Sequence, residues 1–201
     1  MVTLELNQPG KTVLMMGDEA IARGAIEAGI DFCASYPGTP ATEITESLAR
    51  VADRFNIYVE WSTNEIVAFE AATAASLAGL RAVVAMKQMG VNVCADFLMT
   101  VNLAGTNGGL VLAACDDPSA ISSSNEQDSR SYARYADLPL LEPADFQEAK
   151  DMTKWAFEVS EKLGLPCIMR SVTRLSHSRG NVKLGELPEK KRTAKFEGVY
   201  I

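Results

Sequence analysis

The 201-residue sequence has one histidine and no closely spaced cysteines. Its four cysteines, Cys33, Cys94, Cys115 and Cys167, form no C-x-x-C pair, so they do not supply the clustered thiolates of a zinc or iron–sulfur site. The lone His177 argues against a histidine-based metal centre, and we expect it to be structural or on the surface. We therefore predict no metal site in this chain and four buried free thiols, as is typical of a reducing compartment.

The sequence also lacks a surplus of basic residues and a long apolar run. Its net charge of −7 is opposite to that of a typical nucleic-acid-binding surface. No apolar run approaches the roughly 20 residues that a membrane span needs, and the N-terminal segment lacks the apolar core of a signal peptide. With 47% hydrophobic and 22% charged residues, the sequence predicts one sizeable cytoplasmic domain that binds neither nucleic acid nor membranes.

Two common site motifs are missing as well. Gly17 and Gly24 do not make the G-x-G-x-x-G turn of dinucleotide-binding proteins, which disfavours a nicotinamide or flavin site. No G-x-S-x-G elbow accompanies His177, which argues against a Ser–His–acid hydrolase. The chemistry of the chain must therefore come from other residues.

Short β-rich runs alternate with helical stretches along the chain, and this alternation is typical of an α/β domain. It predicts a mostly parallel sheet with helices on both faces. From residue 176 onward the pattern gives way to charged sequence, so we assign 1–180 to the domain and 181–201 to a polar linker or tail. The expected strands are 11–16, 31–36, 56–59, 81–86, 109–115, 138–142 and 166–170, and the main expected helices are 18–28, 41–53, 67–78, 91–103 and 145–162.

One carboxylate, Glu65, lies where a predicted strand ends and an unusually apolar helix begins. A helix that is apolar on most sides is usually buried, and the carboxyl edge of an open α/β sheet is where ligands bind. However, Ser62-x-x-Glu65 also matches a capping box, in which both side chains bond amides of the first helical turn. From these residues alone a capping role and a catalytic role both stay open.

Two other features could contact an anionic ligand. Thr39 and Pro40 fit the N-cap and first residue of the helix at 41–53, where a hydroxyl and free amides suit an anion. A plain strand-to-helix turn explains these residues equally well. Arg130 and Arg134 lie four apart on one helical face and could clamp a carboxylate, although surface ion pairs are the commoner use of such residues.

Five short segments follow one another along the chain in the order in which one known family has them: Gly17–Ala25, Tyr36–Pro40, Glu60–Glu65, Met86–Asn92 and Asn125–Arg130. Together they resemble the pyrimidine-binding domain of the thiamine-diphosphate-dependent 2-oxoacid:ferredoxin oxidoreductases, and especially the alpha subunits of its indolepyruvate branch. The resemblance covers about residues 12–180. It implies the thiamine-diphosphate-binding, pyrimidine-domain fold.

By that resemblance Glu65 is the catalytic residue, a glutamate that contacts N1′ of the cofactor's aminopyrimidine. Sharing a proton with N1′ favours the imino form of the 4′-amine, which can then deprotonate C2 of the thiazolium. Gln88 and Gly90 match the cofactor-binding loop beside the pyrimidine.

The resemblance also implies a substrate and a reaction. Thr39 matches a threonine near the substrate carboxylate, and Arg134 is the candidate for the arginine of the same region, with Arg130 as the second choice. The implied reaction is the oxidative decarboxylation of an aromatic, indolepyruvate-like 2-oxoacid to its acyl-CoA, with electrons passed to iron–sulfur partners.

The sequence departs from the family where the diphosphate would be held. It has no Gly-Asp-Gly…Asn motif for magnesium and diphosphate, and no ferredoxin-like cysteine clusters. We therefore expect half a site, in a hetero-oligomer that adds a diphosphate-binding domain or subunit and a ferredoxin-like iron–sulfur subunit. Magnesium and the clusters would lie on those partners, with coenzyme A and external ferredoxin as further reactants. A non-oxidative thiamine-dependent 2-oxoacid decarboxylase subunit and a non-catalytic small-molecule-binding or scaffold domain stay open as alternatives.

Overall fold

The computed structural model describes residues 3–189 and 192–196. Its main sheet has six strands in the order β3-β2-β4-β5-β7-β6, and each pair of neighbours runs parallel. The predicted α/β fold with a mostly parallel sheet is therefore confirmed. The strands are β2 (Phe32–Ser35), β3 (Tyr58–Trp61), β4 (Ala82–Lys87), β5 (Leu110–Asp116), β6 (Leu140–Leu141) and β7 (Cys167–Val172).

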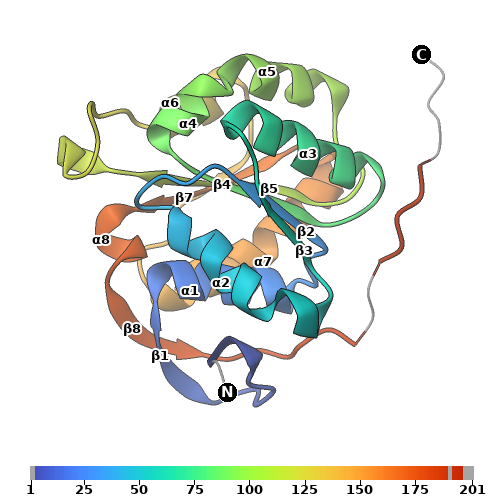
Figure 1. Ribbon diagram of the computed structural model, residues 1–201, viewed down its shortest axis with the longest axis vertical. Coiled ribbons are helices and arrows are strands. Elements are labelled where there is room, and N and C mark those ends of the chain that lie inside the picture. The colour runs from blue at the N-terminus through green and yellow to red at the C-terminus, as the bar shows by residue number, and fades with distance from the viewer. Residues whose placement is uncertain (1–2, 190–191, 197–201) are drawn as a thin grey trace.

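Helices cover both faces of this sheet, as Figure 1 shows. Because each face carries helices, the central strands are apolar on both sides, as parallel strands usually are. On one face lie α1 (Gly17–Glu27), α2 (Thr42–Phe55) and α7 (Phe146–Leu163). On the other lie α3 (Glu65–Leu77), α4 (Gln88–Val93), α5 (Ala95–Ala104) and α6 (Arg130–Tyr135).

The two faces have separate hydrophobic cores that alternate residue by residue along the central strands. On β4, Val83 and Ala85 belong to the core under α1, α2 and α7, while Val84 and Met86 belong to the core under α3 and α5. This alternation fixes the register of the sheet, because a shift by one residue would exchange the two sets.

The helix α3 departs from the expectation that it is buried on most sides. Its inner side, including Phe69, packs fully into the core, but Ile66, Val67 and Leu77 are exposed. The described residues therefore leave an apolar surface on the outside of α3 uncovered.

A second sheet of two strands was not expected. β1 (Thr12–Met16) pairs antiparallel with β8 (Arg179–Lys183), so neither belongs to the main sheet. Sequence analysis missed β8 because only Val182 in it is buried and the rest is polar. The predicted domain boundary at residue 180 falls inside β8 and stays a prediction. Beyond the strand, the Gly185 amide still donates to buried Glu27 at 2.7 Å.

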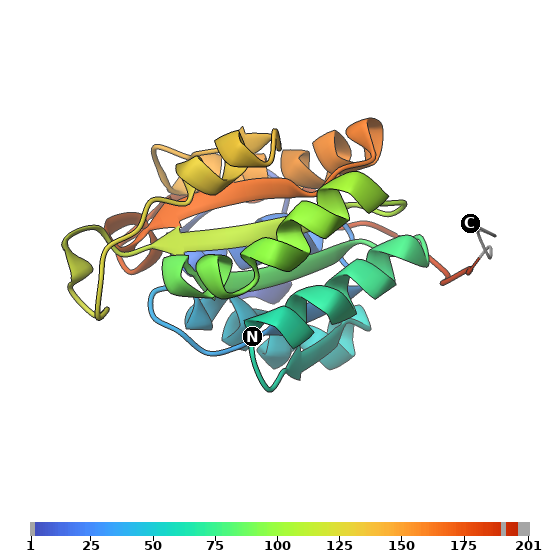
Figure 2. The same cartoon turned by 90° about the horizontal axis from the view of Figure 1, so that it is seen from above.

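All the strands of the main sheet point their carboxyl ends toward one edge. Figure 2 shows the loop after β5 (yellow) and the turn after β2 (blue) projecting from this edge. The chain leaves β2 for α2 on one face and leaves β4 for α4 on the other, and these two strands are neighbours. Such a point of divergence is where open α/β sheets bind ligands. No helix among the described residues is long and apolar enough to cross a membrane.

Candidate functional site

The carboxylate of Glu65 is not part of a helix cap. Asn64 is the N-cap of α3, and its Oδ1 accepts a hydrogen bond from the Val67 amide at 2.9 Å. The Ser62 hydroxyl instead donates to Glu60 Oε1 at 3.0 Å. The capping-box alternative is wrong, because Asn64 directly precedes the helix and serves as its cap. Glu65 is left with no capping role.

Glu65 is the first residue of α3 and is half-buried. Nothing in residues 3–189 or 192–196 donates a hydrogen bond to its carboxylate or pairs with it. Burial, and then the negative charge of Glu65, raise the pKa of the nearby Cys94 thiol to about 12. The thiol is therefore neutral at physiological pH and adds no second negative charge beside the carboxylate. An unpaired carboxylate at the ligand-binding edge of a sheet is available to a ligand.

Gly90 lies directly against Glu65. A Cβ atom at position 90 would lie 2.6 Å from Glu65 Cγ and 2.8 Å from Glu65 Oε1. These are closer than real side-chain contacts, so any other residue would displace the carboxylate. The structure thus brings together two of the predicted cofactor-binding residues from α3 and α4.

The third predicted cofactor-binding residue, Gln88, has its side-chain amide engaged elsewhere. Gln88 is fully buried; its Oε1 accepts from the Asp117 amide at 3.1 Å and its Nε2 donates to the Asn125 carbonyl at 3.3 Å. Gln88 therefore ties the start of α4 to the loop that follows β5. A direct contact of Gln88 with a cofactor stays a prediction.

Thr39 lies in the turn between β2 and α2 and is half-buried. The expected roles of Thr39 and Pro40 as N-cap and first helical residue are wrong, because α2 begins at Thr42. The Gly38 amide donates to Thr42 Oγ1 at 2.9 Å, which closes the turn before the helix. The Thr39 hydroxyl has no hydrogen-bond partner in the described segments, so it is free to bind a ligand.

The two candidate arginines lie on α6 and differ in their surroundings. Arg130 is exposed and pairs with Asp128 at 2.7 Å, and hydrogen bonds from Arg130 lower the pKa of Asp128. This geometry is that of a surface ion pair. Arg134 is also exposed, but it forms no ion pair with any residue the structure describes. Of the two, Arg134 has the free guanidinium.

Sequence analysis missed Lys87, the last residue of β4. Its Nζ donates to the Ser122 carbonyl at 3.1 Å, and its aliphatic stem lies against Gly38, where an added Cβ would be 3.1 Å from Lys87 Cδ. Lys87 thus spans from the turn after β2 to the loop after β5. A lysine that ends an otherwise apolar strand is the signal that could have revealed it.

A buried ion pair was missed as well. Arg170 of β7 donates to Asp116 Oδ2 at 2.6 Å, and the Ser129 hydroxyl donates to Asp116 Oδ1 at 2.5 Å. All three residues are buried. Because the pair joins β5, β7 and the start of α6, it fixes both ends of the loop between β5 and α6.

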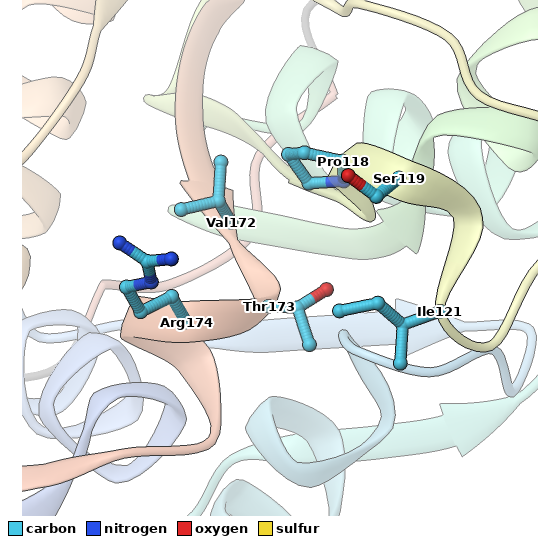
Figure 3. A pocket seen from close by; sticks show the side chains of 6 residues that line it. All are labelled: Pro118, Ser119, Ile121, Val172, Thr173 and Arg174. Atoms are coloured by element: carbon cyan, nitrogen blue, oxygen red, sulfur yellow. The ribbon is translucent and has the colours of Figure 1, made fainter.

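A pocket of about 390 Å³ opens beside this loop, at the same edge of the sheet. Thr173 helps to shape it, since its hydroxyl donates to Asp117 Oδ1 at 2.8 Å. Glu65 is not among the residues that line the pocket. Figure 3 shows the residues that line it: Pro118, Ser119, Ile121, Val172, Thr173 and Arg174.

Comparison with known proteins places the chain in a family. Residues 23–199 match the family described as pyruvate flavodoxin/ferredoxin oxidoreductase, thiamine diphosphate-binding. The chain belongs to this family. The resemblance noted from its motifs is therefore confirmed.

Relatives in this family are similar to the chain over most of its length. It is 56% identical to the indolepyruvate oxidoreductase subunit IorA of Pyrococcus abyssi, over 94% of the chain and 29% of the relative. It is 30% identical to the 2-oxoglutarate synthase subunit KorA of Archaeoglobus fulgidus, over 88% of the chain and 53% of the relative. The chain thus spans about 30% of the length of the IorA relatives.

A solved structure supports the same fold. The 2-oxoglutarate:ferredoxin oxidoreductase from Magnetococcus marinus superposes with a TM-score of 0.78 at 22% identity, over 94% of this chain and 35% of that one. At this identity the likeness concerns the fold alone. Together with the family match, it confirms the predicted type of domain.

Proposed function

We propose that this chain is the pyrimidine-binding half of a thiamine-diphosphate-dependent 2-oxoacid:ferredoxin oxidoreductase. The observation that carries the proposal is Glu65, a half-buried carboxylate without a partner among the described residues, with Gly90 directly against it. Such a carboxylate fits an aminopyrimidine, because it can share a proton with a ring nitrogen. Thiamine diphosphate, when bound, supplies the carbon nucleophile and electron sink that decarboxylation of a 2-oxoacid requires.

In this proposal some residues of the chain act on the cofactor and others bind the substrate. Glu65 holds the proton shared with the ring, and Gly90 leaves the space in which the carboxylate keeps its position. Gln88 acts through the loop after β5, which its side chain holds in place. The free hydroxyl of Thr39 is the proposed donor to the substrate carboxylate. Arg134 is the proposed source of positive charge, ahead of Arg130, which Asp128 already neutralises.

A partner surface is needed to complete this half-site. Close to Glu65 in the chain, the side chains of Trp61, Ile66 and Val67 are 45%, 36% and 39% exposed. Exposed apolar groups of this kind mark contact surfaces. We place there a diphosphate-binding domain or subunit that carries magnesium, within a hetero-oligomer that includes a ferredoxin-like iron–sulfur subunit. The part of the IorA relatives that this chain does not span leaves room for further domains.

The proposed substrate is an aromatic 2-oxoacid of the indolepyruvate type, with an acyl-CoA as product and ferredoxin as electron acceptor. The proposal follows the names of the relatives that are 56% and 55% identical to this chain. We place the enzyme in the cytoplasm, and the four free cysteines are consistent with a reducing compartment.

The experiment is the substitution Glu65→Gln in the complex purified under anaerobic conditions. Indolepyruvate, coenzyme A and an electron-accepting dye would be supplied, and dye reduction measured. We expect turnover to fall about 10²–10⁴-fold, the usual cost of losing a proton-transferring group. The matched control is Glu70→Gln, an exposed glutamate on the same helix, which should leave turnover within about twofold.

Other outcomes would reject the proposal or part of it. Near-normal turnover in Glu65→Gln would remove the proposed role of Glu65. Release of an aldehyde by the unmodified complex without coenzyme A or acceptor would instead identify a non-oxidative decarboxylase. Tight binding of a metabolite by the isolated chain, with no partner, would favour a non-catalytic binding domain.

A further inference from the structure

Three titratable side chains from distant parts of the sequence converge at one point. Asp18 lies in the first turn of α1, Glu43 lies in the first turn of α2, and His177 follows the short helix α8 (Thr173–Ser176). One ligand atom from each lies within 4.8 Å of the other two. Glu43 Oε2 and His177 Nε2 lie 3.2 Å apart. Because α1 and α2 cover the face of the sheet opposite α3, this cluster is separate from Glu65.

The environment of Asp18 is unusual for a carboxylate. Its side chain is fully buried, and neither carboxylate oxygen has a hydrogen-bond partner among the described residues. The nearby Ser176 hydroxyl is engaged with the Ser171 hydroxyl at 2.9 Å. A buried carboxylate without a hydrogen bond is strongly disfavoured unless a proton or a cation neutralises it.

The charges around Asp18 add to this requirement. No lysine or arginine in the described part of the chain pairs with Asp18 or Glu43. The cluster is therefore an uncompensated pair of carboxylates beside an imidazole, and it would gain from a positive ion.

We propose that Asp18, Glu43 and His177 form a binding site for a divalent transition-metal ion, with zinc as the best match. Two carboxylate oxygens and one imidazole nitrogen are a donor set that zinc accepts, with a fourth position left for water. Zinc–ligand distances of about 2.0–2.2 Å put two tetrahedral ligands about 3.3–3.6 Å apart. The separation of 3.2 Å between Glu43 and His177 is close to this spacing. Asp18 would complete the set from the buried side.

The surroundings allow an ion to enter and let it act as a cross-link. The side chains of His177 and Glu43 are 32% and 33% exposed, so the cluster is open to solvent on their side. The helix N-termini beside Asp18 and Glu43 favour the ionised carboxylates that a metal requires. A bound ion would join the first turns of α1 and α2 to the segment after β7. Sequence analysis predicted no metal site because it searched for clustered histidines and cysteines, whereas these ligands are far apart in the chain.

The test is direct titration of zinc into the 201-residue chain after chelator treatment, followed by calorimetry. We expect one zinc ion per chain, removable by chelator, and a melting temperature that rises with zinc concentration. Manganese and magnesium are titrated in parallel, and we expect magnesium to bind more weakly because it prefers oxygen ligands alone.

The decisive variant is His177→Ala, because an exposed side chain can be removed without unfolding the chain. Its zinc affinity should fall at least about 100-fold, since loss of a ligand costs no less than loss of a residue that supports one. The variant Glu43→Gln should show a similar loss of zinc affinity. Glu46→Gln, on the same helix and exposed, is the matched control and should bind zinc as the unmodified chain does. The proposal is overturned if the unmodified chain does not bind zinc, or if His177→Ala binds it as tightly as Glu46→Gln does.

Discussion

At the scale of single residues, two neighbours of Glu65 leave its carboxylate free to contact a ligand. Asn64 caps α3, so the carboxylate of Glu65 is not used for capping. Gly90 has no side chain, so that carboxylate can occupy the space between α3 and α4. Both residues could be picked out from the sequence, but not their contact, because 25 positions separate them and only the tertiary fold brings them together.

The substitution Gly90→Ala tests this contact. The new methyl group would lie 2.6–2.8 Å from the side chain of Glu65, so the carboxylate must move. We expect turnover of the assembled complex to fall about 100-fold, since a misplacement of about 1 Å can cost that much. The melting temperature serves as the control and should fall by only a few degrees, because the end of a glutamate side chain can give way. Unchanged turnover would show that the position of Glu65 does not matter.

At the scale of helices and strands, the sequence predicted the kinds of element better than their ends. The six strands of the main sheet were all expected, because buried parallel strands are short apolar runs between turn residues. Two helix caps that the sequence suggested, Ser62 and Thr39, were wrong, since several residues in a row could act as the cap. The strand β8 was missed because its stability comes from pairing with β1, far away in the sequence, rather than from an apolar pattern of its own.

The start of α3 offers a matched pair of substitutions. Asn64→Ala removes the hydrogen bond that Asn64 accepts from the Val67 amide and should lower the free energy of unfolding by about 1 kcal/mol. Ser62→Ala removes the alternative cap that the sequence suggested. This substitution should change the free energy of unfolding by less than about 0.5 kcal/mol. Urea denaturation of both variants measures the difference. The reverse order would restore the capping box of Ser62 and Glu65.

At the scale of the whole molecule, the chain is an α/β domain whose candidate site we propose to be completed by a partner. One edge of the sheet carries Glu65, Gly90 and Thr39, and apolar side chains close to Glu65 are exposed. The fold and the family were predictable because the motifs occur in order along the chain. The pocket beside the loop after β5 and the cluster around Asp18 were not, because each combines residues from segments far apart in sequence.

The central claim is that this chain supplies half of a thiamine-diphosphate site. The most direct measurement is native mass spectrometry of the protein isolated from its own cells under anaerobic conditions. We predict a complex in which the chain, or a longer polypeptide that contains it, is associated with thiamine diphosphate, magnesium and iron–sulfur components. A free chain of 21.7 kDa that carries no cofactor and no partner would contradict the claim.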